Sequence, residues 1–196
     1  MEREFLISDC VLIPTGGSLK SEYRLNRGNP IISYFESIKS PSISLSIQFI
    51  DVDQLVSNKG ITGGEYLKLR ISTTGYDDFE ITPEHKMMLN SVKDVRTSSR
   101  KEMARLEFVS VESIVNETAR LSKKFAGPVS ETVRKILEDD EKGIKTTKDI
   151  EVDQATNSYT FCGNLKRSID TIFDFLKIGL QITQYIFFCF TCLSFL

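Results

Sequence analysis

Residues that could perform catalysis are few in this sequence of 196 residues. The chain has one histidine, His85, and it lies in the polar stretch Thr82-Pro83-Glu84-His85-Lys86. A histidine acts as a general base only beside an oriented partner, and no Gly-x-Ser-x-Gly elbow or His-Glu-x-x-His helix occurs in the chain. The residue types therefore indicate a protein that is not an enzyme, with an enzyme of unknown class as an open alternative.

Side chains that could hold a metal or a phosphate are poorly grouped. Cys189 and Cys192 have the spacing of half a zinc site, but a structural zinc needs four ligands and the sequence offers no second pair. The stretch Gly60–Gly64 precedes an expected strand and lacks the lysine and the helix of a phosphate loop. The acidic run Asp139–Glu141 is not embedded in calcium-loop spacing. We therefore expect no metal and no cofactor.

Composition is that of an ordinary globular chain. With 40% hydrophobic and 27% charged residues, the chain can bury a sizeable core. The formal net charge of −2 supplies no basic field for binding nucleic acid. No apolar leader follows Met1, which indicates a cytosolic, reduced protein in which Cys10 and Cys162 are small buried residues.

Residues 1–109 have the pattern of a β domain. Between Ser42 and Val52 apolar and polar residues alternate, which is the period of a strand with one buried face. Further strands are expected at 4–13, 31–38, 66–71, 79–81, 87–95 and 103–111, separated by polar turns. This series favours an antiparallel barrel or sandwich over a parallel α/β sheet. The residues expected to point into the core from the alternating strand are Ile43, Leu45, Ile47, Phe49 and Asp51.

The connection that follows the alternating strand has an unusual shape. Pro41 stands at the entrance of the strand, where its missing N–H removes no ladder bond. About a dozen residues then lead to the next strand, including the polar loop Ser57–Gly60 and the pair Gly63-Gly64. This length exceeds that of a tight hairpin, so we expect the glycines to bend the backbone in a looped crossing. The charges interleaved with apolar residues around the start of the next strand are Glu65, Lys68 and Arg70.

Helical spacing replaces alternation from residue 110 to 177. Ser110 is expected to cap a first helix whose apolar stripe extends to Phe125. Gly127 and Pro128 are expected to stop this helix and to begin the next one. The chain is thus expected to be α+β, with an α-rich unit after the β domain.

The end of the α-rich unit is expected to contain a small β-hairpin and a third helix. Residues 150–153 and 158–162 are predicted to pair around a turn at Ala155-Thr156-Asn157. Asn164 is expected to cap the third helix, which continues to Leu176.

The stretch Ile178–Leu196 carries no charged residue and is rich in phenylalanine. Its length approaches the roughly 20 residues that a membrane span needs. Gln181, Thr183 and Gln184 interrupt its first half. An open alternative is therefore a tail-anchored membrane protein with a cytosolic β/α interaction domain.

Several short motifs occur in an order that resembles one known family. From about residue 5 to 177, the chain resembles the N-terminal part of the central baseplate hub protein of contractile-tailed (myovirus-type) phages. The order of the motifs is the specific feature, because none of them is diagnostic alone. The motifs are Glu36-Ser37-Ile38, Ser40-Pro41, Ile50-Asp51, Gly63-Gly64-Glu65 and Leu106-Glu107-Phe108, followed by the segments Glu112–Phe125, Pro128–Leu137 and Asn164–Leu176.

The resemblance implies a fold and a role. Residues 1–109 would form a tail-tube-type β-barrel or sandwich, and residues 110–177 an α-rich hub subdomain. Such hubs are homotrimeric structural proteins of the virion baseplate, made in the host cytoplasm, that adapt the tail tube protein to the central spike protein. Genome DNA would pass through the ring without sequence-specific binding, in agreement with the absence of a basic stripe.

The resemblance also implies where subunits meet. Edge strands would pair across subunits, and the element from Pro41 to Ile71 would supply the inter-subunit sheet and a long loop. The residues placed at interfaces in this way are Glu36, Ser37, Pro41, Asp51, Asn58, Gly63, Gly64 and Glu65.

The chain departs from the family pattern after Lys177. A hub of this family has a second tube domain beyond the α-rich part, whereas this sequence stops at residue 196. The uncharged stretch 178–196 is therefore expected to be non-native sequence that follows a truncation or a frameshift. A short variant completed by a separately encoded half is the other possibility.

Overall fold

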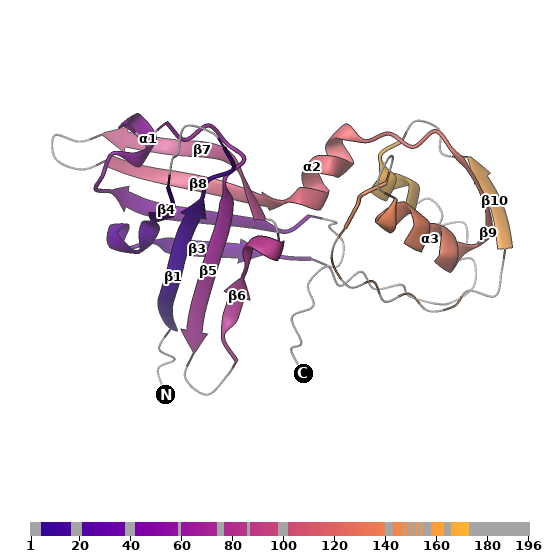
Figure 1. Ribbon diagram of the computed structural model, residues 1–196, viewed down its shortest axis with the longest axis horizontal. Coiled ribbons are helices and arrows are strands. Elements are labelled where there is room, and N and C mark those ends of the chain that lie inside the picture. The colour runs from indigo at the N-terminus through magenta and orange to yellow at the C-terminus, as the bar shows by residue number, and fades with distance from the viewer. Residues whose placement is uncertain are drawn as a thin grey trace. The chain divides into compact units, whose positions relative to one another are not determined.

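Two compact units make up the chain in the computed structural model, which describes residues 5–16, 21–37, 42–58, 60–73, 77–85, 87–97, 102–139, 143–146, 148, 150, 152, 154, 158–162 and 166–172. Unit 1 comprises Met1–Glu36 and Ile43–Val111, and unit 2 comprises Ser37–Ser42 and Glu112–Leu196. The predicted α+β class is confirmed, since a large antiparallel sheet is accompanied by a few helices (Figure 1).

Unit 1 is built on an eight-stranded antiparallel sheet with the order β2-β1-β5-β7-β8-β4-β3, and β6 also pairs with β5. Its short helices are η1 (Leu25–Gly28), α1 (Leu55–Asn58) and η2 (Pro83–His85). Its strands are β1 (Phe5–Ile13), β2 (Tyr23–Arg24), β3 (Ile31–Phe35), β4 (Ser44–Asp51), β5 (Tyr66–Thr73), β6 (Phe79–Ile81), β7 (Met87–Thr97) and β8 (Glu102–Ser110).

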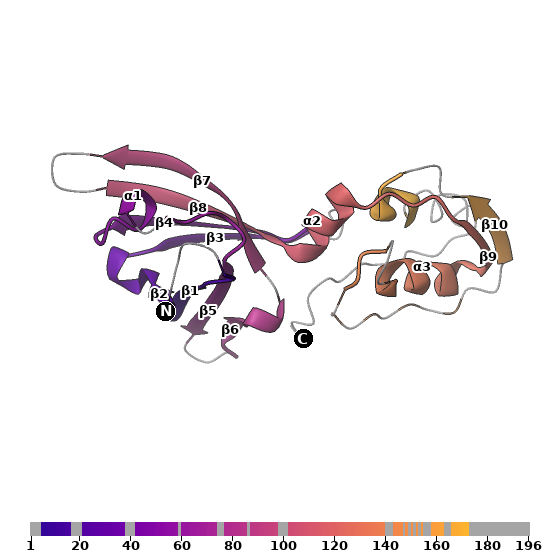
Figure 2. The same ribbon diagram turned by 45° about the horizontal axis from the view of Figure 1, so that its top comes forward.

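The sheet divides into two layers at its middle. β5 and β7 pair at a single position, Tyr66 with Met88. We call the strands β2, β1, β5 and β6 layer 1, and the strands β3, β4, β8 and β7 layer 2. Figures 1 and 2 show β1, β5 and β6 running across the direction of β3, β4, β7 and β8. The sheet therefore folds over on itself as a sandwich.

The core of unit 1 lies between these layers. The burial of β4 alternates without a break, so Leu45, Ile47 and Phe49 point inward as the sequence predicts. Each such side chain stabilises the fold by about 1.5–3 kcal/mol relative to an exposed one. The fully buried partners contributed by the other strands are Leu12, Leu67, Leu69, Leu106 and Phe108.

The open side of the sandwich between β1 and β4 is closed by η1. Leu25 anchors this helix in the core, where its side chain is 1% exposed. A Cβ on Gly28 would lie 2.4 Å from the carbonyl oxygen of Ile50 and 3.0 Å from the ring of Phe49, so only glycine fits there. The close approach holds η1 directly against β4.

Two side-chain contacts also join the layers. The hydroxyl of Tyr23 at β2 donates a hydrogen bond of 3.0 Å to Asp53, in the turn after β4. The rings of Tyr34 in β3 and Phe79 in β6 pack edge to face with centroids 5.1 Å apart. Side chains thus close the sandwich where strand pairing does not.

The connection after β4 differs from its expected form. α1 occupies part of the expected polar loop, and β4 and β5 are not neighbours, because β8 and β7 lie between them. Glu65 is also not on the exposed face: it is 2% exposed and shares the buried face with Leu67. The connection between β4 and β5 is thus a looped crossing, as expected, and it also contains the helical turn α1.

Unit 2 combines short helices with a two-stranded sheet. β10 pairs with β9, and residues 150 and 152 lie in no strand, whereas residues 151, 153 and 155–157 of the predicted hairpin lie outside the described residues. Phe125 lies in β9 and not in the first helix, which ends at Thr118. Residues 168–172 are helical, but the expected cap Asn164 lies outside the described residues. The elements are α2 (Val111–Thr118), β9 (Lys124–Pro128), α3 (Val129–Glu138) and β10 (Ser158–Cys162).

The core of unit 2 forms where α3 packs beside β9 and the 168–172 helix. The buried residues of α3 recur at the helical spacing that the sequence predicts for the segment after Pro128. The buried members of this core are Leu121, Phe125, Val129, Val133, Ile136, Leu137, Ile144, Ile169 and Ile172.

Three further expectations concern single side chains or the end of the chain. Ser110 does not cap α2, because its buried hydroxyl has no hydrogen-bond partner among the described residues. Cys10 is buried as expected, whereas Cys162 is exposed. Within the described part of the chain, no helix is long and apolar enough to cross a membrane, and Ile178–Leu196 lies outside that part.

Candidate assembly site

The outer edge of β3 is the first candidate for assembly. β3 ends the strand order, so no strand of the described residues pairs with its other side. Ile31 and Phe35 are 64% and 59% exposed, and Ser33 lies between them on the same face. A strand edge with apolar side chains and no charge is a template for pairing with another chain.

β7 supplies a second edge, on the opposite side of layer 2. β5 pairs with β7 only at Met88, and Leu89 is bonded to the connection that precedes β5. Between Asn90 and Thr97, no strand of the described residues occupies this edge. Among the strands that the structure describes, layer 2 therefore has an open edge at each end.

The Pro41–Ile71 element cannot offer such an edge through β4. β4 pairs with β3 along one side and with β8 along the other. Its backbone groups are therefore used inside the chain. The expectation that this element supplies the inter-subunit sheet is wrong for β4, and β3 takes its place as the edge strand.

A cross-strand ion pair lies on the outer face of layer 2. The ammonium group of Lys93 lies 2.7 Å from a carboxylate oxygen of Glu107, across the β7–β8 ladder. Lys93 holds the pKa of Glu107 below its ordinary value, because the ammonium donates to the carboxylate. Ser91 donates a second hydrogen bond to Glu107, and Arg105 lies opposite Lys93 in the next register position.

The interface residues expected from the sequence fall at two ends of layer 2. One row across the sheet consists of residues that pair with one another on successive strands: Phe35 with Ser44, Ser44 with Val109, and Val109 with Met88. Tyr66 of β5 pairs with Met88 and continues this row. Asp51 lies in a row at the opposite end. Three of the expected residues, Glu36, Gly64 and Glu65, are close in sequence to members of the first row. Asn58 follows Asp51 at the other end. Pro41 lies outside the described residues.

The side chain of Asp51 caps the start of α1 within unit 1. It is 3% exposed, and its two carboxylate oxygens accept the N–H groups of Leu55 and Val56 at 2.7 and 2.9 Å. These N–H groups begin α1, where a helix offers donors without intrahelical partners. Asn58, at the end of α1, donates to Gln54 and is exposed. Of the two, Asn58 is the residue that another chain can reach.

The Gly63-Gly64-Glu65 segment is shaped by its backbone. Both glycines have φ of +89°, which favours residues without a Cβ. Gly64 donates to the carbonyl of Leu89 at 2.9 Å, and Thr15 donates to the carbonyl of Gly64. Glu65 accepts the N–H of Thr62 at 3.1 Å. The segment therefore fixes the start of β5.

The remaining expected residues stand near the end of β3. Glu36 accepts the hydroxyl of Tyr34 at 2.9 Å and is partly exposed. Ser37 is also partly exposed and belongs to unit 2. Interface roles for Glu36 and Ser37 stay predictions.

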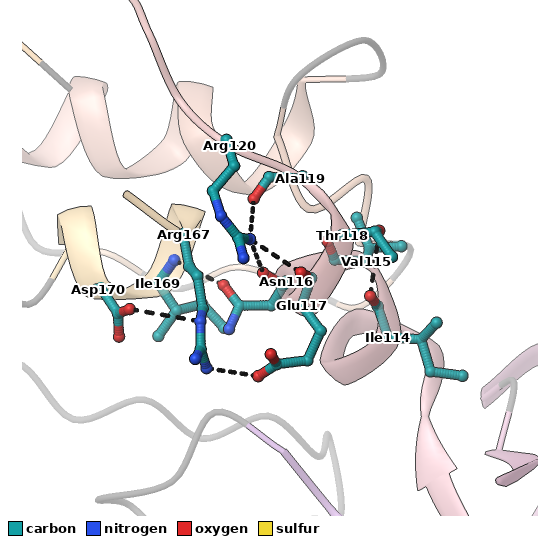
Figure 3. Close-up of polar contacts among 10 residues, drawn as sticks. All are labelled: Ile114, Val115, Asn116, Glu117, Thr118, Ala119, Arg120, Arg167, Ile169 and Asp170. Atoms are coloured by element: carbon teal, nitrogen blue, oxygen red, sulfur yellow. Dashed lines mark hydrogen bonds and ion pairs between the residues drawn. The ribbon is translucent and has the colours of Figure 1, made fainter. Parts of the chain in front are cut away.

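A polar cluster in unit 2 ties α2 to the 168–172 helix (Figure 3). The guanidinium of Arg120 donates to the carbonyls of Glu117 and Asn116, among the last carbonyls of α2, and thereby ends the helix. The amide oxygen of Asn116 accepts the N–H of Ile169 at 3.0 Å. Arg167 forms ion pairs with Glu117 and Asp170. The cluster organises the unit internally and has the geometry of paired helix caps.

The described part of the chain contains His85 and Cys10, two residues whose side chains are capable of chemistry. Among these residues, no group of three or more His, Cys, Asp or Glu is placed to hold a metal ion. His85 accepts the N–H of Thr82 through Nδ1, as part of a turn. Burial raises the pKa of the Cys10 thiol to about 12, so the thiolate is disfavoured.

Comparisons with known proteins give a likeness to solved structures. No protein-family model and no curated protein matches the chain. A solved structure to which the chain is similar is that of the E. coli c3393 protein, a component of the type VI secretion system described as structurally similar to the T4 bacteriophage tail proteins gp27 and gp5. The TM-score is 0.46 at 8% sequence identity, over 90% of this chain and 40% of that protein. The chain thus spans less than half the length of the protein it matches.

Proposed function

We propose that this chain is a structural protein of a contractile-tail baseplate hub, whose copies join side by side through layer 2. The observation that carries the proposal is the pair of open edges, β3 at one end of layer 2 and β7 at the other. The motif order described for the sequence supports the same class of protein.

Strand direction favours head-to-tail joining. All pairings in layer 2 are antiparallel, so β3 and β7, which stand at opposite ends of four alternating strands, run in opposite directions. A rotation about an axis along the strands preserves these directions. β3 of one copy would therefore meet β7 of the next in antiparallel orientation, and the sheet would continue from copy to copy.

The proposed assembly has a passage lined by the outer face of layer 2. On this face the anion Glu107 is paired with Lys93, so the charge of this lysine is neutralised. A wall of this kind lets DNA phosphates pass without holding them. In the virion baseplate, the ring would be a homotrimer that contacts the tail tube protein above and the central spike protein below.

The test is a charge placed on the edge of β3. Phe35→Lys and Ile31→Lys put an ammonium group on the edge, where strand pairing would bury it. The matched control is Val52→Lys, because Val52 is 65% exposed but lies in the turn after β4. We expect the wild type and the Val52 variant to sediment as ring-sized oligomers and both β3 variants as monomers.

Electron microscopy of the wild-type oligomer measures ring closure and the number of copies. A wild-type chain that stays monomeric at high concentration contradicts the proposal, as do β3 variants that assemble like the control. Co-purification with a tail tube or spike protein separately tests the baseplate assignment.

A further inference from the structure

The outer edge of β1 is covered in an unusual way. β2 pairs with β1 only at Val11 and Leu12. Over Phe5–Cys10, no strand of the described residues lies on that side of β1. Phe5 and Leu6 are 64% and 67% exposed, so the beginning of β1 has the apolar character that invites strand addition.

The side chain of Asn26 occupies this edge. The amide oxygen of Asn26 accepts the N–H of Cys10 at 2.9 Å, and its amide nitrogen donates to the carbonyls of Ile7 at 3.2 Å and Ser8 at 3.4 Å. A neighbouring strand would offer the same kinds of group, a carbonyl and an N–H. The carboxamide of Asn26 thus fills the place that two peptide groups of an added strand would take.

Asn26 is held rigidly in this position. It lies in η1, between the buried Leu25 and the tightly packed Gly28. Gly28 lies so close to Ile50 of β4 that no Cβ would fit between them, so η1 is packed directly against β4. The carboxamide is therefore preorganised against the edge of β1.

The competing strand is β3 of a second copy. β3 carries no charge, and its exposed side chains Ile31 and Phe35 are apolar like Phe5 and Leu6 on β1. Every copy presents both strands at equal concentration. Without a blocking group, β3 of a neighbour could therefore pair with β1 as well as with β7.

We infer that Asn26 is a specificity-determining residue for self-assembly, which bars β3 of a second copy from the edge of β1 and leaves β7 as the edge it can take. The choice of partner strand rests on the proposed function. The barrier itself rests on the three hydrogen bonds of Asn26.

The test compares Asn26→Ala with wild type by sedimentation velocity over a range of concentrations. We expect the variant to shift to species larger than those of the wild type, because the uncovered edge accepts a second strand. Thr118→Ala is the matched control: it removes hydrogen bonds from a side chain to the backbone, but within α2 and away from any strand edge. An Asn26→Ala protein that sediments like wild type overturns the inference.

A double variant separates strand addition from unfolding. Leu6→Lys places a charge on the exposed start of β1, so Asn26→Ala combined with Leu6→Lys should return to the wild-type sedimentation pattern. If the large species persist in the double variant, they come from unfolding and the inference is wrong. If the wild type is monomeric and Asn26→Ala alone polymerises, the proposed ring fails and the role of Asn26 stands. If the wild type forms rings and Asn26→Ala leaves them unchanged, the proposed ring stands and the inference about Asn26 is wrong.

Discussion

Replacing Gly28 by alanine should destabilise unit 1 by about 2–3 kcal/mol. The added Cβ would lie 2.4 Å from the carbonyl oxygen of Ile50, whereas ordinary contact begins at 3.4 Å, so about 1 Å of movement is needed. The obstacle is backbone and cannot rotate away. Ile50 belongs to β4, whose pairing with β3 and β8 resists displacement. We therefore expect a cost in the upper part of the range for overpacked sites.

Urea denaturation of Gly28→Ala measures this cost directly. In a domain of this size, each kcal/mol also lowers Tm by about 4–8 °C. Ser46→Ala is the matched control, because Ser46 lies on the outer face of β4 and should change stability by less than about 0.5 kcal/mol. If Gly28→Ala unfolds at the same urea concentration as the control, η1 does not lie against β4. The closure of the sandwich, and with it the fixed position of Asn26, would then be refuted.

Three substitutions and one labelling experiment test separate parts of the structure. Ile47→Asp should leave little folded protein by circular dichroism, since an unpaired charge at a position 0% exposed costs about 4 kcal/mol or more. Asp51→Ala should lower the unfolding free energy by about 1–2 kcal/mol through loss of the α1 cap, and a fully stable variant would contradict this role. Lys148→Met should cost about 3 kcal/mol in urea titration, because it leaves the carboxylate of Glu112, which is 6% exposed, without its ammonium partner at 3.3 Å. Cys10 should resist iodoacetamide at pH 8 until urea unfolds the chain, as peptide mass spectrometry can show. Because its folded pKa of about 12 exceeds the reference value of 9.0, the related stability is complete below pH 9 and is lost as pH rises toward 12.

Local patterns predicted the strands better than they predicted the strands' partners. The alternation through Ile47 identifies β4 and its buried face, because side-chain direction in a strand depends only on position along the chain. Which strand lies beside β4 depends on packing across the whole domain. Phe5 pairs with Thr73, and Ser44 with Val109, and neither pairing leaves a signal near the residues concerned.

The first helix of unit 2 shows how spacing alone misleads. Phe125 has the helical spacing of Ile114, but α2 ends at Thr118, where Arg120 binds the last carbonyls. Gly127 then has φ of +127°, outside the helical region, and β9 pairs with β10. The competing strand partner lies more than thirty residues further along the chain, out of reach of a local pattern.

Two of the expected interface residues have an internal role in the structure. The family pattern drew attention to Asp51 and Glu65. The carboxylate of Asp51 accepts the N–H of Leu55 after it, and that of Glu65 accepts the N–H of Thr62 before it. That internal use depends on the geometry of the turn, which the sequence does not reveal. Asn26 was missed, because an asparagine in a polar turn looks like any other until β1 is placed beside it.

The long-range pairing of unit 1 has a consequence for how the chain is made. During synthesis β3 and β4 emerge as a hairpin, and two strands alone are at best marginally stable. β4 gains its second neighbour only after β8, ending at Ser110, has left the ribosome. Until then the uncharged edge of β3 and the open side of β4 are both available to other nascent chains. Domains dominated by such distant contacts fold in about milliseconds to seconds, so the yield of soluble protein should depend on the rate of translation and on chaperones that shield this hairpin.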